Sequence, residues 1–180
     1  MMAGTLGLWN PCCFMHRRIF LQGAALLACS AVATPAGVVA ALLPANPVFG
    51  RSLPALQGGE TPLSGWLGQP VLMNFWASWC APCVRELPLL QSLHEQYPDL
   101  AVLGLAVDTQ ANVQRFIEKV PVSYPLLLTG TQGVALMREL GNKSGVLPFS
   151  ILFDRDGHVA DRLLGELKED DIQVRIKRIL

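Results

Sequence analysis

The chain has 180 residues, enough for one domain with a sizeable core and an N-terminal extension. Its 14 Lys and Arg residues balance its 14 Asp and Glu residues, and no large basic cluster occurs, which argues against a nucleic acid as partner. Apolar residues make up 51% of the chain, and the excess over an ordinary soluble domain comes from the first fifty residues.

The N-terminal segment, residues 1–45, has the pattern of an export signal. Arg17 and Arg18 precede a stretch that carries no charge until Arg51, and Ile19–Leu43 is almost wholly apolar or small. A positive end followed by an apolar stretch is typical of secretory signals. Two adjacent arginines followed by x-Phe-Leu resemble the twin-arginine export signal. We therefore expect the rest of the chain to lie in the periplasm.

Three fates of this segment remain open from the sequence. Cleavage after a small residue such as Ala40 or Ala45 would release a soluble domain. The apolar stretch could instead stay as a membrane anchor, or Cys29 could be lipidated. The start is also open, because translation could begin at Met1, Met2 or Met15.

Residues 46–180 are expected to form an α/β domain. Asn46–Gly59 is rich in Pro and Gly and predicts a linker that runs into a short hairpin. Two strands that are apolar throughout, with a helix between them, predict a parallel pair with a right-handed crossover. The expected elements of the first half are a strand at Val71–Ala77, a helix at Pro82–Tyr97 and a strand at Leu100–Val107.

The sequence of the second half of the domain predicts an inserted helical segment, followed by a hairpin and a last helix. Asp154-Arg155-Asp156-Gly157 is a turn signal for an antiparallel hairpin. Acidic residues from Glu166 onward and basic residues near Arg178 complement the dipole of a last helix. The expected elements are a helix from Asp108 or Thr109 to Lys119, a strand at Tyr124–Leu128, a helix at Gly133–Leu140, strands at Ser150–Phe153 and His158–Leu164, and the last helix.

The domain contains a single pair of cysteines. Cys12, Cys13 and Cys29 lie in the N-terminal segment, so that Cys80 and Cys83 are the only thiols after residue 45. One pair excludes a framework of structural disulfides and a four-cysteine zinc ribbon in the domain.

Cys80 and Cys83 stand where a strand ends and a helix begins. At a helix N-terminus the free backbone N–H groups and the positive end of the dipole stabilise a thiolate, which is the species that attacks disulfides. Cys80 is nearer the helix end and is predicted to be the exposed nucleophile. Cys83 lies one turn inside and is predicted to be the buried resolving thiol.

The motif resembles that of thioredoxin residue by residue: Phe75-Trp76-Ala77-Ser78-Trp79-Cys80-Ala81-Pro82-Cys83, with Pro88 five residues on. Glu86 and the inserted segment between about 108 and 130 are similar to the exported TlpA/ResA-like thiol reductases. The resemblance implies a thioredoxin-like fold, with a central mixed sheet flanked by helices, an N-terminal hairpin and a helical insertion.

The resemblance also implies the roles of several residues. Asn74 replaces the aspartate that thioredoxin carries six residues before its first cysteine, so the proton-accepting role passes to Glu86. A carboxylate one turn after Cys83 would raise thiol pKa values, and a solvated helix glutamate is the alternative interpretation. Pro148 matches the family's cis-proline, preceded here by the bulky Leu147. The substrate-binding residues implied are Trp79, Pro82, Leu147 and Pro148.

The predicted function is the reduction of disulfides in exported proteins, apocytochrome c among them, through a mixed disulfide at Cys80. The resemblance implies an integral-membrane thiol electron donor, and the reaction needs no dissociable cofactor; we expect a monomer. A dithiol oxidase on the same fold stays open, and a Cu(I) metallochaperone is a further alternative. A peroxiredoxin-type peroxidase would require Thr and Pro where Ala77 and Met73 stand. His94 and His158 are assigned to ordinary surface or strand positions.

Overall fold

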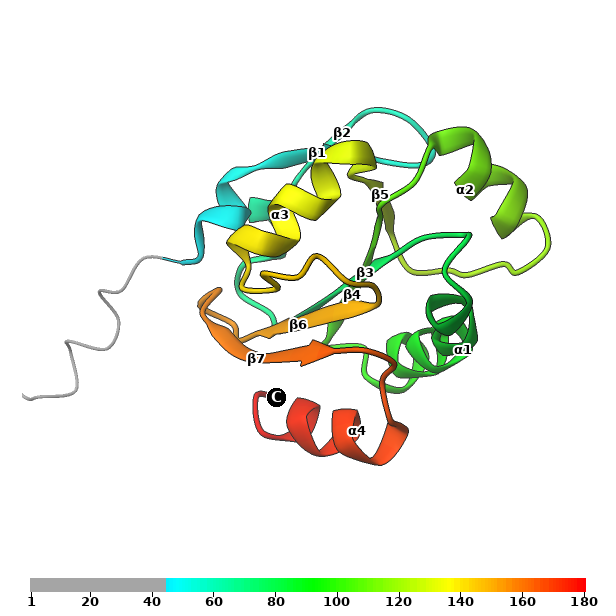
Figure 1. Ribbon diagram of the computed structural model, residues 1–180. Helices are drawn as coiled ribbons and strands as arrows, with labels where there is room; N and C mark the ends of the chain where they lie inside the picture. Colours follow the sequence, from blue (N-terminus) through cyan, green and yellow to red (C-terminus); the bar gives the residue numbers. More distant parts are fainter. Residues whose placement is uncertain (1–44) are drawn as a thin grey trace, which may run out of the picture. The chain divides into compact units, whose positions relative to one another are not determined.

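A computed structural model describes residues 45–180 of the chain (Figure 1). The expectations for the export signal, for cleavage at Ala40, for Cys29 and for the start of translation fall on residues 1–44 and lie outside the described residues. Within residues 45–180, no helix has both the length and the apolar character needed to cross a bilayer.

A five-stranded mixed sheet forms the centre of the domain, in the order β5-β4-β3-β6-β7. The three strands β3, β4 and β5 are parallel, and β6 and β7 continue the sheet in antiparallel fashion. This arrangement confirms the predicted α/β fold and the parallel pair around the crossover helix. The strands are β3 (Val71–Trp76), β4 (Ala101–Ala106), β5 (Leu126–Leu128), β6 (Phe149–Phe153) and β7 (Val159–Leu164).

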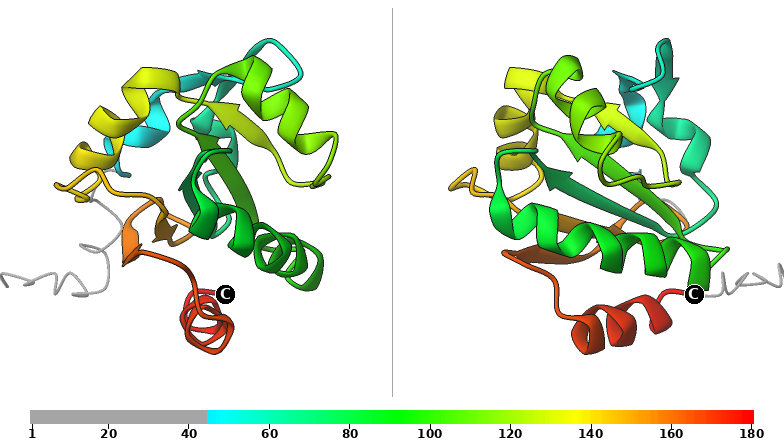
Figure 2. Two further views of the ribbon diagram at one scale, coloured as in Figure 1. Left: turned by 45° about the vertical axis from the view of Figure 1, so that its right-hand side comes forward. Right: turned by 90° about the vertical axis from the view of Figure 1, so that its right-hand side faces the viewer.

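The central strand β3 is buried on both faces of the sheet, because helices cover both. One face packs against the helices α1 (Ala81–Gln96), α2 (Gln110–Ile117) and α4 (Glu169–Lys177). The other face packs against α3 (Gly133–Glu139) and the N-terminal segment of the domain. Figures 1 and 2 show α1 and α4 together on one side of the sheet and α3 on the other. Asn74 lies on the α1 side, where it meets Glu86.

The segment after residue 45 differs from the expected linker. It forms a 3-10 helix, η2 (Pro47–Gly50), whose Val48 and Phe49 are buried in the core on the α3 side. The predicted short hairpin follows as β1 (Ser52–Pro54) and β2 (Glu60–Pro62), and a second 3-10 turn, η3 (Leu63–Trp66), leads into β3. Two apolar side chains that find a place in the core outweigh the Pro-rich composition that suggested a linker.

The last helix also starts later than predicted. Glu166 does not open it, because α4 begins at Glu169, and Glu166 instead lies in the connection from β7. Leu167 in the same connection is buried in the core. The remaining helix and strand predictions agree with the structure to within a few residues at each end. One further short turn, η4 (Gly130–Gln132), precedes α3.

Candidate redox site

Cys80 and Cys83 are joined by a disulfide at the start of α1. Cys80 is the N-cap of the helix, and its Sγ accepts a hydrogen bond at 3.4 Å from the backbone N–H of Cys83. This N–H is one of the groups that a helix N-terminus leaves without an intrahelical partner. After reduction the same N–H and the helix dipole would stabilise a thiolate on Cys80.

Cys80 is less exposed than the sequence predicted, whereas Cys83 is buried as expected. Cys80, predicted to be exposed, retains only 6% of its accessible surface, and Cys83 retains none. Trp79 and Leu147 line the same groove as Cys80. Cys80 still borders an open groove and Cys83 does not, so the predicted difference in access between the two sulfurs holds.

The groove beside Cys80 has a volume of about 470 Å³ and is almost entirely apolar. Its walls come from the active-site turn, the end of β4, α3 and the loop before β6. Three of its residues are exposed: Ala81, Trp79 at 68% and Val146 at 53%. The lining residues are Trp79, Cys80, Ala81, Pro82, Val107, Val134, Gly145, Val146 and Leu147.

Of the four residues expected to bind substrate, the structure places three in this groove: Trp79, Pro82 and Leu147. Pro148 is buried behind Leu147, and the peptide bond between them is cis. The carbonyl of Pro148 accepts a hydrogen bond from the Gly165 N–H at 2.9 Å, which ties this loop to the connection after β7. The loop thus forms one wall of the groove beside the disulfide.

Glu86 is buried on α1, one turn after Cys83, with 2% of its surface exposed. Its Oε1 accepts a hydrogen bond from Asn74 Nδ2 at 2.6 Å, and its Oε2 accepts one from the Leu167 N–H at 3.0 Å. Asn74 Nδ2 also donates to Ser150 Oγ at 3.0 Å on the neighbouring strand β6. The interpretation of Glu86 as a solvated helix residue is therefore wrong.

Burial raises the pKa of Glu86 to about 7, because a carboxylate loses its hydration in the core. The hydrogen bonds from Leu167 and Asn74 oppose this shift, and the negative charge of Glu166 adds to it. A carboxyl group with this pKa exchanges its proton near neutral pH. At three residues from Cys83 along α1, the Cβ atoms of such a pair are about 5–6 Å apart.

Sequence reasoning missed the role of Asp108, which it considered only as a possible start of the following helix. Asp108 Oδ2 accepts hydrogen bonds from the Ser78 N–H at 3.0 Å and the Ser78 hydroxyl at 2.6 Å. Burial alone would raise the pKa of Asp108, but hydrogen bonds from Ser78, Asn112 and Thr109 hold it below its usual range. The sequence feature that could have revealed this role is the position of Asp108 at the carboxyl end of β4, next to the strand that leads to Cys80. Asp108 thus fixes the turn just before the disulfide.

Sequence reasoning also missed the polar atoms around Glu86. The hydroxyl of Tyr124 and Nε1 of Trp76 are buried and, within residues 45–180, have no hydrogen-bond partner. Burial and the charge of Glu86 both raise the pKa of Tyr124. Gly104 makes room for both side chains, because a Cβ at this position would lie 3.1 Å from the Tyr124 ring and 3.2 Å from Trp76 Nε1.

His94 is not at an ordinary surface position. It is half-buried, its ring packs edge-on against Tyr124, and within residues 45–180 its buried Nδ1 has no hydrogen-bond partner.

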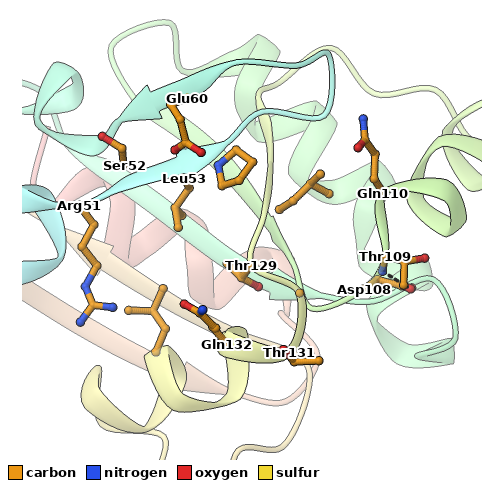
Figure 3. A pocket seen from close by; sticks show the side chains of 14 residues that line it. Arg51, Ser52, Leu53, Glu60, Asp108, Thr109, Gln110, Thr129, Thr131 and Gln132 are labelled. Atoms are coloured by element: carbon orange, nitrogen blue, oxygen red, sulfur yellow. Dashed lines mark hydrogen bonds between the residues drawn. The ribbon is translucent and has the colours of Figure 1, made fainter.

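A second, more polar pocket of about 530 Å³ lies at the ends of β4 and β5 (Figure 3). Arg51, Glu60 and Asp108 contribute charged groups to it, and Thr129 and Gln132 also line it. Arg51 is held by an ion pair with Glu139. The pocket contains neither cysteine and shares only the loop at Asp108 with the surroundings of the redox site.

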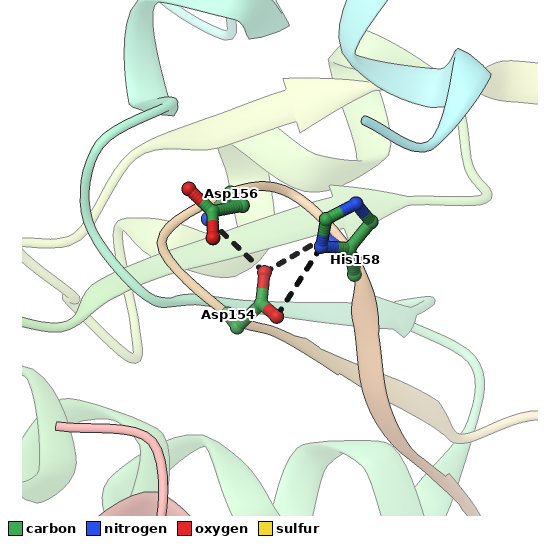
Figure 4. A group of neighbouring side chains, drawn as sticks. All are labelled: Asp154, Asp156 and His158. Carbon is green, nitrogen blue, oxygen red and sulfur yellow. Dashed lines mark hydrogen bonds and ion pairs between the residues drawn. The ribbon is translucent and has the colours of Figure 1, made fainter. Parts of the chain in front are cut away.

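Asp154, Asp156 and His158 bring three potential metal ligands within 4.8 Å of one another (Figure 4). The turn between β6 and β7 explains this cluster. Asp154 Oδ1 accepts hydrogen bonds from the backbone N–H groups of Asp156 at 3.0 Å and His158 at 2.8 Å. This is the hairpin turn predicted from the sequence. The cluster contains neither cysteine and follows from the local backbone.

Comparison with known proteins agrees with the geometry of the site. Residues 45–164 match the AhpC/TSA family. The thiol-disulfide oxidoreductase ResA of Bacillus thuringiensis is 30% identical over 133 residues, covering 69% of this chain and 71% of that protein. ResA of Geobacillus thermodenitrificans is 32% identical over 129 residues, with the same coverage.

Solved structures show the same fold. MTB DsbF in its mixed oxidized and reduced forms superposes with a TM-score of 0.67 at 24% identity, covering 76% of this chain and 99% of that chain. A thioredoxin-related protein from Neisseria meningitidis serogroup B superposes with a TM-score of 0.59 at 30% identity, covering 66% of this chain and 92% of that chain. The chain therefore belongs to the AhpC/TSA family and, within it, to the thioredoxin-like thiol-disulfide oxidoreductases.

Proposed function

We propose that this protein is a reductase that transfers two electrons from the Cys80–Cys83 dithiol to disulfides of exported proteins. The observation that carries the proposal is the asymmetry of the disulfide: Cys80 borders an open apolar groove, and Cys83 is buried on the helix face that leads to Glu86. Such an arrangement assigns the attack on substrate to one sulfur and the release of product to the other.

In the first step, the Cys80 thiolate attacks one sulfur of the substrate disulfide. A bond forms between Cys80 Sγ and that sulfur, and the other substrate sulfur leaves as a thiolate. In the second step, Cys83 loses its proton and attacks Cys80 Sγ, and the second substrate thiolate leaves. The substrate gains two electrons, and Cys80–Cys83 becomes the disulfide.

Glu86 accepts the proton of Cys83 in the second step. Its pKa of about 7 allows it to take up a proton near neutral pH, which an ordinary exposed glutamate does poorly. Asn74 and Leu167 hold the carboxylate from two sides and so fix its direction. Asn74 itself has a neutral amide and cannot serve as a base.

The groove binds the substrate segment around the reactive cysteine, with Trp79, Pro82 and Leu147 as the contact residues, and the buried Pro148 shapes the loop that carries Leu147. The substrates we propose are exported proteins, with apocytochrome c cysteines among them. A membrane-embedded thiol donor would restore the dithiol, since the periplasm is kept oxidising. Residues 1–45 would serve as export signal or anchor, and residues 46–180 would act in the periplasm as a monomer. This part of the proposal rests on the resemblance to exported thiol reductases.

The test is reduction of a fluorescence-quenched peptide disulfide whose cysteines are flanked by apolar residues. The reduced protein should cleave it in a single turnover and be recovered as the Cys80–Cys83 disulfide. A protein that instead oxidises a reduced dithiol peptide, while leaving the disulfide peptide intact, would be a dithiol oxidase. Stoichiometric binding of Cu(I) without turnover of either peptide would favour a metallochaperone.

A further inference from the structure

Two neighbouring pairs of residues connect α1 with the segment between β7 and α4. Arg85 and Glu86 are adjacent on α1, and Glu166 and Leu167 are adjacent on the connecting segment. On the outside, Arg85 Nε donates to Glu166 Oε1 at 3.1 Å and Arg85 Nη2 donates to Glu166 Oε2 at 2.6 Å. On the inside, the Leu167 N–H donates to Glu86 Oε2 at 3.0 Å. One ion pair thus lies directly beside the buried hydrogen bond.

We propose that the Arg85–Glu166 ion pair positions the Leu167 N–H against the Glu86 carboxylate and so sets the proton affinity of Glu86. Both residues are positioning residues, because neither lies in the groove beside Cys80. This inference rests on the proposed function, in which Glu86 accepts the Cys83 proton.

The connecting segment has few other attachments near Glu86. Gly165 donates its N–H to the Pro148 carbonyl at 2.9 Å, and the Leu167 side chain is buried in the core. α4 begins only at Glu169. The bidentate bond from Arg85 is therefore the contact that fixes the residue between Gly165 and Leu167. A fork of two parallel hydrogen bonds restrains direction as well as distance.

The surroundings of Glu86 determine the direction of the expected effect. The groups around it are Asn74 and Ser150 from the sheet, Tyr124 from the segment before β5, Cys83 on α1, and Glu166. Glu166 is the carboxylate among them, and its negative charge raises the pKa of Glu86. Arg85 neutralises that charge. Its loss would expose the charge and loosen the Leu167 N–H, and both effects would raise the pKa of Glu86 further.

The measurement is an NMR titration of the Glu86 side-chain carboxyl carbon in the oxidised full chain. It reads the proton affinity without turnover. In Arg85→Gln, the ionisation constant of Glu86 should fall about tenfold, which corresponds to one pKa unit. Arg85→Lys keeps the charge next to Glu166 but loses the two-pronged contact, so it should restore only part of the original value. The matched control is Arg51→Gln, which breaks the surface ion pair with Glu139 and should leave Glu86 unchanged.

An unchanged Glu86 titration in Arg85→Gln would overturn the inference. A change of the same size in Arg51→Gln would do so too, because the effect would then be general. The rate at which the mixed disulfide resolves in Glu86→Gln separates this result from failure of the proposed function. If that rate equals the wild-type rate, the assignment of Glu86 as proton acceptor is wrong, whatever the titration of Arg85→Gln shows.

Discussion

The two sides of the Cys80–Cys83 disulfide differ in almost every physical property. The outer side is an apolar groove in which Trp79 and Val146 are exposed. The inner side is buried and polar, with Glu86, Asn74 and Ser150 joined by hydrogen bonds. Thiol–disulfide exchange needs a place for the substrate and a place for a proton. Under the proposed function, the apolar groove serves the first task and the buried polar cluster around Glu86 serves the second.

The largest effects should come from the sulfurs themselves. Cys80→Ser should reduce peptide cleavage to background, because no nucleophile then faces the groove. Cys83→Ser should instead stop after the first step and accumulate protein joined to substrate, because the resolving thiol is missing. Mass spectrometry of the non-reduced protein distinguishes the two. Equal trapping by both variants would show that the two sulfurs are equivalent and that the division of tasks is wrong.

Removing the acid on the inner side should slow only the second step. In Glu86→Gln we expect the mixed disulfide to resolve about 100-fold more slowly at pH 7, a typical effect of a lost general base. The first step at Cys80 should change little. Stopped-flow fluorescence with a labelled substrate resolves the two steps. The matched control is Glu95→Gln, an exposed position on the same helix. A Glu86→Gln variant slowed equally in both steps would point to a structural defect.

The raised pKa of Glu86 also predicts how the stability of the folded protein depends on pH. The pKa of Glu86 is raised in the folded protein from 4.5 to about 7, so the folded state binds this proton more tightly than the unfolded state. Its stabilising contribution is complete below about pH 4.5 and is lost as the pH rises through about 7. The loss is on the order of 3 kcal/mol. Urea unfolding of the oxidised protein at pH 5 and pH 8 measures it, and Glu86→Gln should remove most of the difference.

Substitutions in the apolar groove should weaken substrate binding, with a smaller effect than the substitutions at Cys80, Cys83 and Glu86. Val146→Asp places a charge in the apolar groove and should raise KM for an apolar-flanked peptide about fivefold, with kcat nearly unchanged, since about 1 kcal/mol of apolar burial is lost. Val174→Asp is the control, because Val174 on α4 is 50% exposed and lies outside the groove. A fall in kcat at constant KM for Val146→Asp would mean that the groove does not bind the substrate.

The fold and the two sulfurs could be predicted from the sequence because their signals are local. Apolar runs such as Val71–Trp76 and the turn at Asp154–Gly157 identify strands and hairpin without any long-range information. The inner side could be predicted only in part. The burial of Glu86 on α1 depends on Asn74, Leu167 and Tyr124, which come from three other segments of the chain. Likewise the contact of Glu166 with Arg85 spans 81 residues, so a run of acidic residues looked like the start of a helix.

The equilibrium reduction potential of the Cys80–Cys83 couple, measured against a dithiothreitol or glutathione buffer, tests most directly whether this protein donates electrons to its substrates. A thiol reductant should have a value near that of thioredoxin, about −270 mV. A value near about −120 mV, as in strong dithiol oxidants, would contradict the proposed direction and would mean that the groove delivers disulfides to its substrates.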